Sequence, residues 1–235
     1  TKIVKHHLYG IITVKKHFSA GEWLKKVKIK INTCVKKKKI PIIVGGTGLY
    51  FNTITKGISK IPDIDLKTRN KVRNLYKKLG IKKFYNLLIK LDPKSKGRIL
   101  PTDSQRIQRA YEVKLKTKKS LYEWFEKTKS DFLEFDIRKI FIEIPRDILL
   151  NKISMRTEQM FKKKCINEVK KFNNLKVNKS FSANKLIGVQ EINDYLKGLI
   201  TLEQCKDLIN IKTRQYAKRQ NTCLLYTSPS PRDTR

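Results

Sequence analysis

IPIIVGGTGLY, at residues 40–50, says more about the architecture of this chain than any other segment. Its short apolar run ends at two glycines, after which Thr47 and a third glycine lead into a helix-like stretch. The run is too short for a core helix, and glycines let a backbone turn sharply and approach a bound group closely. The pattern predicts a buried parallel strand that ends at a ligand-facing loop, since ligands bind outside the carboxyl ends of such strands.

The chain is strongly basic. Its 235 residues include 55 Lys and Arg against 20 Asp and Glu, a formal net charge of +35. Such an excess predicts a polyanionic partner, because Lys and Arg displace counterions from phosphates. Lysine greatly outnumbers arginine, however, and Ile and Asn are abundant, as an AT-rich coding sequence would produce without selection for binding. Charge alone leaves both explanations open.

Nothing in the composition indicates a membrane protein or a metal scaffold. No apolar run approaches the roughly 20 residues that span a bilayer, and the first residues contain no apolar signal-peptide core. The four cysteines lie far apart without a C-x-x-C pair, which favours reduced thiols. We therefore expect a cytoplasmic protein with no membrane partner.

Two kinds of periodicity divide the chain. Apolar or alternating β-rich runs predict strands at residues 8–14, 40–44 and 139–144. Helical spacing predicts helices at residues 20–31, 66–79, 82–91, 103–115, 121–127, 146–161, 167–172, 189–196 and 202–219. Strands interrupted by an all-helical block predict the α/β class with a helical insertion. The expected domains are a partial α/β core at residues 1–62, a helical insertion at 63–135, and the core continuation with C-terminal helices at 136–222.

The last part of the chain differs from the rest. Residues 223–235 contain no lysine, although lysine is frequent everywhere before them. The Ser-Pro-Ser-Pro within this segment cannot continue the preceding helix. We interpret residues 223–235 as a non-native tail and leave them out of the fold prediction.

Thr47 is the first candidate functional residue. The loop around it lacks the Gly-Lys-Ser/Thr ending of a Walker phosphate loop. A threonine at this position suits a helix N-cap, and its hydroxyl and the loop amides can also face a ligand. The two roles are compatible.

The second candidate region is residues 98–113. Thr102 and Gln105 fit a capping box, which would explain both structurally. In the helix that follows, Gln105, Arg106 and Arg109 lie opposite an apolar stripe. Two guanidinium groups and an amide on one face can bind phosphates or base edges, although a purely solvated face has the same pattern.

Two further basic features have simple structural explanations. Arg214, Lys218 and Arg219 lie near the end of the terminal helix, where positive charge suits the helix dipole. Arg156 is a single arginine in a helical stretch and predicts little by itself.

Taken in order, these segments resemble the tRNA dimethylallyltransferases, the isopentenyl transferases that modify an anticodon-loop adenine. The likeness runs from about residue 5 to residue 222, and its specificity lies in the ordered set rather than in any one motif. The matching segments are His6-His7-Leu8, Phe18-Ser19-Ala20, residues 42–50, Asp92-Pro93, Arg98-Ile99, Pro101-Thr102-Asp103, Gln105-Arg106, Arg109-Ala110, Glu112-Val113, Arg156, Met160, Glu168-Val169, Ile187-Gly188, Glu191-Ile192, Lys218-Arg219-Gln220 and Thr222.

The resemblance implies transfer of a dimethylallyl group from dimethylallyl diphosphate to N6 of the anticodon-adjacent adenosine of tRNA. It implies a P-loop NTPase-like parallel-sheet core, incomplete in this chain, with a helical insertion and a nucleotide-binding character. The adenine would be flipped into a channel, and Mg²⁺ would neutralise the departing diphosphate. The implied partners are the tRNA anticodon stem-loop and dimethylallyl diphosphate, bound by a monomer.

The resemblance also assigns site residues. Thr47 would belong to the catalytic site and contact the target nucleotide, and Arg156 would lie near the diphosphate. The implied tRNA-binding residues are Thr47, Arg69, Gln105, Arg106, Ile107, Gln108, Arg109, Leu186, Ile187, Gly188, Val189, Gln190, Glu191, Lys218, Arg219, Gln220, Asn221 and Thr222.

This sequence departs from the family pattern in one important respect. The family's phosphate loop and its general-base aspartate would precede Thr1, so the chain as given is expected to be an N-terminally truncated fragment without activity of its own. Two alternative functions remain open at this stage. One is a P-loop nucleotide kinase or NTPase, and the other is a basic RNA-binding module without enzymatic activity.

Overall fold

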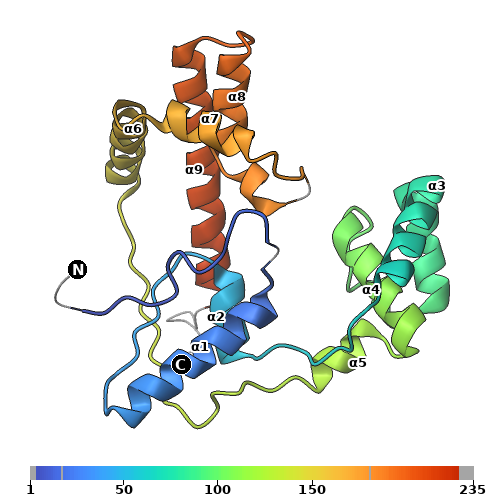
Figure 1. Cartoon of the computed structure of the whole chain (residues 1–235). Coiled ribbons are helices and arrows are strands. Elements are labelled where there is room, and N and C mark those ends of the chain that lie inside the picture. The colour runs from blue at the N-terminus through green and yellow to red at the C-terminus, as the bar shows by residue number, and fades with distance from the viewer. Residues whose placement is uncertain (1–3, 17, 180, 228–235) are drawn as a thin grey trace. The chain divides into compact units, whose positions relative to one another are not determined.

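The computed structural model describes residues 4–16, 18–179 and 181–227, and it divides into two compact units (Figure 1). The discontinuous unit comprises Thr1–Asn52 and Ile137–Arg235, and the central unit comprises Thr53–Asp136. The α-helices are α1 (Ala20–Lys36), α2 (Gly48–Thr55), α3 (Leu66–Leu91), α4 (Ser104–Thr117), α5 (Leu121–Glu126), α6 (Arg146–Lys162), α7 (Cys165–Asn174), α8 (Val189–Leu196) and α9 (Leu202–Thr227). Two short 3₁₀ helices are η1 (Pro93–Ser95) and η2 (Ser182–Lys185).

The predicted parallel-sheet core is wrong for this structure. None of the residues that the structure describes lies in a β-strand, so the predicted strands at 8–14, 40–44 and 139–144 are loops. Ile40, Ile42 and Val44 are 88%, 81% and 84% exposed, and Ile140 is 89% exposed. A run of β-branched and apolar residues shows only that the side chains would fit a strand. A strand forms only when a neighbouring segment supplies the ladder hydrogen bonds.

The predicted helices are confirmed, with shifted ends. Helix α1 begins as expected after Ser19, whose side chain forms a capping box with Glu22, and it runs on to Lys36. Two predicted helices at 66–79 and 82–91 form one element, α3, which is broken at Gly80. Gly80 has φ 70° and ψ 170°, a conformation that side-chain-bearing residues rarely adopt.

The central unit is built on the packing of α3 against α4. Val72, Phe84 and Leu88 of α3 and Ile107 of α4 are completely buried in one hydrophobic cluster. The Phe84 ring meets Tyr76 edge-on at 5.4 Å and Tyr111 at 4.9 Å between centroids. Burial of this many large side chains gives the unit a core of its own.

A buried polar cluster connects η1 with the start of α5. The Asp92 carboxylate, 1% exposed, accepts hydrogen bonds from Ser95 Oγ at 2.9 Å and Ser120 Oγ at 2.8 Å. Ser120 is also the N-cap of α5. The two serine hydroxyls and Asp92 Oδ2 therefore satisfy one another in the interior.

In the discontinuous unit, α6 and α8 both pack on α9, with α7 beside them (Figure 1). Cys165, Val169, Ile192, Cys205 and Ile209 form the core of this bundle. All four cysteines have free thiols, as expected, and burial raises the pKa of Cys205 to about 11. Among the described residues, no helix is long and apolar enough to cross a membrane.

Helix α9 continues to Thr227, so the first residues of the predicted tail are helical in this structure. The remainder of that tail, residues 228–235, lies outside the described residues. The predicted domain limits stay predictions.

Candidate functional site

The glycine-threonine loop, residues 45–48, leads directly into α2. Thr47 is exposed. Its carbonyl accepts a hydrogen bond from the Tyr50 amide at 3.0 Å, at the start of α2. Tyr50 in turn stacks on Trp23 of α1, with 4.2 Å between ring centroids and 6° between ring planes. The start of α2 is thus held by a backbone bond on one side and an aromatic stack on the other, while Thr47 stays accessible.

The glycines of this loop make room for α9. Gln220 Nε2 donates to the Gly46 carbonyl at 3.0 Å, although the two residues are 174 positions apart. A Cβ at Gly46 would overlap the Gln220 side chain, and a Cβ at Gly48 would overlap Cys223 Sγ. The sequence predicted that glycines here admit a ligand, whereas the structure fills these two positions with side chains of α9.

The other predicted residues of α9 are mostly exposed. Lys218, Arg219, Asn221 and Thr222 are exposed, and the Thr222 hydroxyl donates back to the Lys218 carbonyl at 3.1 Å. Gln220 alone among them is half-buried, because its side chain turns toward Gly46. Helix α9 therefore presents basic side chains outward next to a contact with the glycine-threonine loop.

The predicted contact segment 186–191 divides into exposed and buried parts. Leu186 and Gln190 are exposed, Ile187 and Val189 are half-buried, and Gly188, at φ 103°, stands just before α8. Gln190 Nε2 donates to Asp194 Oδ1 at 2.8 Å. Only part of this segment is available to a partner.

Glu191 is a structural residue in this arrangement. It is 2% exposed, accepts the Gly188 amide at 2.7 Å, and pairs with Lys212 of α9. Burial acts to raise the pKa of the Glu191 carboxyl, but hydrogen bonds from Lys212 and from backbone amides outweigh it and lower the pKa. A buried carboxylate with these partners is not free to bind RNA.

The central unit carries the predicted residues of α4. Its N-cap is Asp103, whose carboxylate accepts the Arg106 amide at 3.1 Å, so the predicted Thr102–Gln105 capping box is wrong. Aspartate one position later offers the better acceptor at the actual start of the helix. Gln105 and Arg106 are exposed, whereas Ile107 is completely buried.

Arg106 and Arg109 both have acidic neighbours, Arg106 at the N-cap of α4 and Arg109 within the helix. Arg106 Nε lies 3.2 Å from Asp103 Oδ2, and an Arg109 terminal nitrogen lies 3.7 Å from Glu112 Oε2. Gln108 Nε2 donates to the Ser104 carbonyl at 3.1 Å. These short-range pairs hold the side chains along the helix and leave part of each guanidinium open.

Gln108 also lines a hollow that the sequence analysis missed. The hollow has a volume of about 430 Å³ and is lined by Gln108 together with Asn70, Arg73, Asn74, Tyr76 and Lys77 of α3. Polar residues at 70, 73, 74 and 77 follow helical spacing, and that spacing could have revealed a polar face. Nearby on α3, Arg69 Nε is buried and has no hydrogen-bond partner among the described residues.

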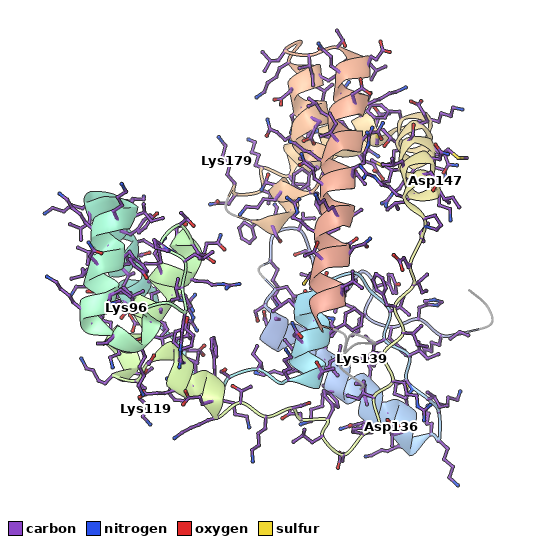
Figure 2. All side chains as sticks on the ribbon, turned by 180° about the vertical axis from the view of Figure 1, so that it is seen from behind. Lys96, Lys119, Asp136, Lys139, Asp147 and Lys179 are labelled. Carbon is purple, nitrogen blue, oxygen red and sulfur yellow. The ribbon has the colours of Figure 1, made fainter. Side chains whose placement is uncertain are left out.

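Arg156 lies exposed on α6 of the discontinuous unit. Basic side chains occur in both units, among them Lys96 and Lys119 of the central unit and Lys179 of the discontinuous unit, all three outside the helices (Figure 2). The positive charge is therefore widely distributed and does not by itself locate a site.

The described residues do not assemble a metal centre. Within residues 4–16, 18–179 and 181–227, no group of three or more His, Cys, Asp or Glu side chains could hold a metal ion.

Comparison with known families accounts for the ordered motifs. The profile of the IPP transferase family matches residues 1–224. The chain belongs to the IPP transferase family.

Its relatives include enzymes from several bacteria. The tRNA dimethylallyltransferase of Pelagibacter ubique (strain HTCC1062) is 52% identical over 221 residues, which cover 94% of this chain and 71% of the relative. The tRNA dimethylallyltransferase of Wolbachia pipientis subsp. Culex pipiens (strain wPip) is 37% identical over 218 residues, or 92% of this chain and 73% of the relative.

Two solved structures are also similar to this chain. The tRNA isopentenylpyrophosphate transferase of Bacillus halodurans is 29% identical, with a TM-score of 0.61 over 94% of this chain and 68% of that one. A eukaryotic dimethylallyltransferase, crystallised acting on tRNA, has a TM-score of 0.80 over 96% of this chain and 58% of that one. At 24% identity this second likeness concerns the fold alone.

Proposed function

We propose that this protein is a tRNA-modifying prenyltransferase that transfers a dimethylallyl group from dimethylallyl diphosphate to N6 of the adenosine next to the anticodon. One observation carries the proposal: the family profile matches residues 1–224, and a relative named tRNA dimethylallyltransferase shares 52% identity over 94% of the chain. The net charge of +35 supports a polyanionic substrate.

Thr47 is the proposed contact to the target adenosine. Its exposure and its position at the start of α2 leave the hydroxyl able to meet a base edge. The backbone bond to Tyr50 and the Trp23 stack hold this part of the loop in place. The loop thus offers a fixed polar group to a base that is extruded from its stack.

Most of the proposed tRNA contacts are exposed, and most are basic or amide side chains; Arg69 and Arg109 are half-buried. In the discontinuous unit these are Lys218, Arg219, Asn221 and Thr222 of α9, with Leu186 and Gln190 before and within α8. In the central unit they are Gln105, Arg106 and Arg109, with Arg69 on α3. Guanidinium and ammonium groups bind RNA by neutralising its phosphates, so the affinity for RNA should fall steeply as the salt concentration rises.

Arg156 is proposed to bind the diphosphate of the donor. Its guanidinium is exposed on α6 and offers a planar fork of donors that matches phosphate oxygens. The involvement of Mg²⁺, a nucleotide-binding phosphate loop, a monomeric state and a cytoplasmic location stay predictions. The described residues contribute binding and orientation of the two substrates.

The test is prenyl transfer by the protein expressed from its complete reading frame. The substrates are an anticodon stem-loop with adenosine next to the anticodon and radiolabelled dimethylallyl diphosphate. We expect label on N6 of that adenosine and none when it is replaced by guanosine. Absence of transfer, with NTP hydrolysis instead, would favour a P-loop kinase or NTPase, and RNA binding without either activity would favour a binding module.

A further inference from the structure

We infer that Gln220 is a positioning residue that fastens the glycine-threonine loop to α9, and that it does not act as a tRNA contact. This inference rests on the proposed function for its catalytic consequence, because Thr47 is the group being positioned. Its structural part stands on the contacts between α9 and residues 46–48 alone.

The first observation is the hydrogen bond itself. Gln220 Nε2 donates to the Gly46 carbonyl at 3.0 Å, and Gly46 immediately precedes Thr47. Gln220 and Gly46 are both half-buried, whereas the flanking Arg219 and Asn221 are exposed. Fixing the Gly46 carbonyl fixes the peptide plane between Gly46 and Thr47, and hence the direction in which the Thr47 side chain leaves the backbone.

The second observation is steric. A Cβ at Gly46 would overlap the end of the Gln220 side chain, and a Cβ at Gly48 would overlap Cys223 Sγ. Gln220 and Cys223 are three positions apart on α9, so they lie on one face of that helix. Two contacts from one helix face thus bracket Thr47 on both sides along the chain.

The third observation concerns the opposite end of the loop. The Tyr50 amide donates to the Thr47 carbonyl, and the Tyr50 ring stacks on Trp23. These contacts hold the loop where it enters α2, but they do not involve the peptide between Gly46 and Thr47. That peptide is held by the hydrogen bond from Gln220. Because α9 also carries the exposed Lys218 and Arg219, the same helix that offers charge to RNA sets the orientation of Thr47.

The chain offers a matched pair of substitutions. Gln220→Glu keeps the size of the side chain but replaces the donating amide with a carboxylate, which repels the Gly46 carbonyl. Gln215→Glu makes the same change on an exposed position of the same helix. Both variants lose the same amount of positive net charge, so any difference between them reports the contact to Gly46.

Steady-state prenyl transfer by the full-length enzyme on the anticodon stem-loop is the first readout. Gln220→Glu and Gln220→Ala should lower kcat about three- to tenfold, the range expected for one hydrogen bond, while KM for the RNA matches that of Gln215→Glu. A raised KM with unchanged kcat would overturn the inference, because it would make Gln220 a direct RNA contact. An unchanged kcat and KM would overturn it as well.

Gly46→Ala supplies a second genetic test. The added methyl displaces the Gln220 amide, so Gly46→Ala should reproduce the kcat loss of Gln220→Ala, and the double variant should be no worse than either single one. Losses that multiply in the double variant would mean that the two residues act independently, and would refute the contact.

Amide hydrogen exchange gives a readout that needs no catalysis. The Tyr50 amide, bonded to the Thr47 carbonyl, should exchange faster in Gln220→Glu than in Gln215→Glu, while core amides of the α6–α9 bundle stay protected. Unchanged exchange at Tyr50 would overturn the inference even if the enzyme prenylates tRNA. Faster exchange in a protein that fails to prenylate tRNA would instead retain the contact and reject the proposed function.

Discussion

The α3–α4 core of the central unit and the loops at residues 40–44 and 139–144 are both rich in apolar residues, yet they behave in opposite ways. Phe84, Leu88 and Ile107 are completely buried, whereas Ile40 and Ile140 are almost completely exposed. Helices satisfy their own backbone hydrogen bonds and need only pack one face, but an apolar extended segment needs a neighbour for both backbone and side chains. The comparison shows that apolar content alone does not create a core.

The largest loss of stability should follow from creating a cavity in the α3–α4 core. Phe84→Ala removes a completely buried ring that contacts Tyr76 and Tyr111, so we expect a loss of about 3–5 kcal/mol in free energy of unfolding. Urea denaturation followed by Trp124 fluorescence would measure it, since Trp124 packs against the same cluster. A loss no larger than that of an exposed-site variant would contradict the assignment of Phe84 to the core.

A smaller loss of stability should follow from removing the carboxylate at the centre of the buried polar cluster in the same unit. Asp92→Ala leaves the Ser95 and Ser120 hydroxyls without their acceptor, which should cost about 1–3 kcal/mol. The exposed Asp63→Ala is the matched control within the unit. Equal urea midpoints for the two variants would show that the cluster contributes nothing to stability.

The stack of Trp23 on Tyr50 tests the region next to residues 40–44. Trp23→Ala should weaken the attachment of α2 to α1 by about 0.5–1.5 kcal/mol, whereas Trp23→Phe keeps an aromatic ring and should lose less. Hydrogen exchange at the first amides of α2 is the measurement. Equal exchange in both variants would mean that the stack does not hold the helix.

The Glu191–Lys212 pair gives a pH-dependent effect in the discontinuous unit. Because the pKa of Glu191 is lowered in the folded state, its ionised form stabilises the protein above the unfolded-state pKa, and this contribution is lost as pH falls through the folded-state value. The stability difference between wild type and Glu191→Gln should therefore be largest near neutral pH and shrink below about pH 4. Urea titrations across this range would show it.

The exposed Glu203→Gln on the same helix bundle is the control for that titration. If Glu203→Gln and Glu191→Gln depend on pH identically, the buried ion pair does not contribute.

The smallest effect is expected at the exposed loops. Ile140→Thr should change the free energy of unfolding by no more than about 0.5 kcal/mol, because the side chain is 89% exposed. A loss comparable to that of Phe84→Ala would show that residues 139–144 are covered in the folded protein, and would erase the contrast between the two regions.

Local patterns predicted the helices well and the site only in part. The spacing predicted two helices at residues 66–79 and 82–91, which the structure joins as α3 across the break at Gly80, and it predicted the start of α1 at Ala20. The same reasoning misplaced the cap of α4 by one residue, because Thr102 and Asp103 are both good caps. For Glu191, motif position indicated an RNA contact, but Lys212 and burial in the bundle give it a structural role.

The sequence by itself determined the helices and the family, because helical spacing is local and the ordered motifs extend over nearly the whole chain. Only the tertiary structure decided whether the apolar run at residues 40–44 is paired, and what occupies the space left by Gly46 and Gly48. The physical reason is distance along the chain. Gly46 contacts the side chain of Gln220, 174 residues away in the sequence. A local sequence pattern does not predict which distant residue packs against a glycine.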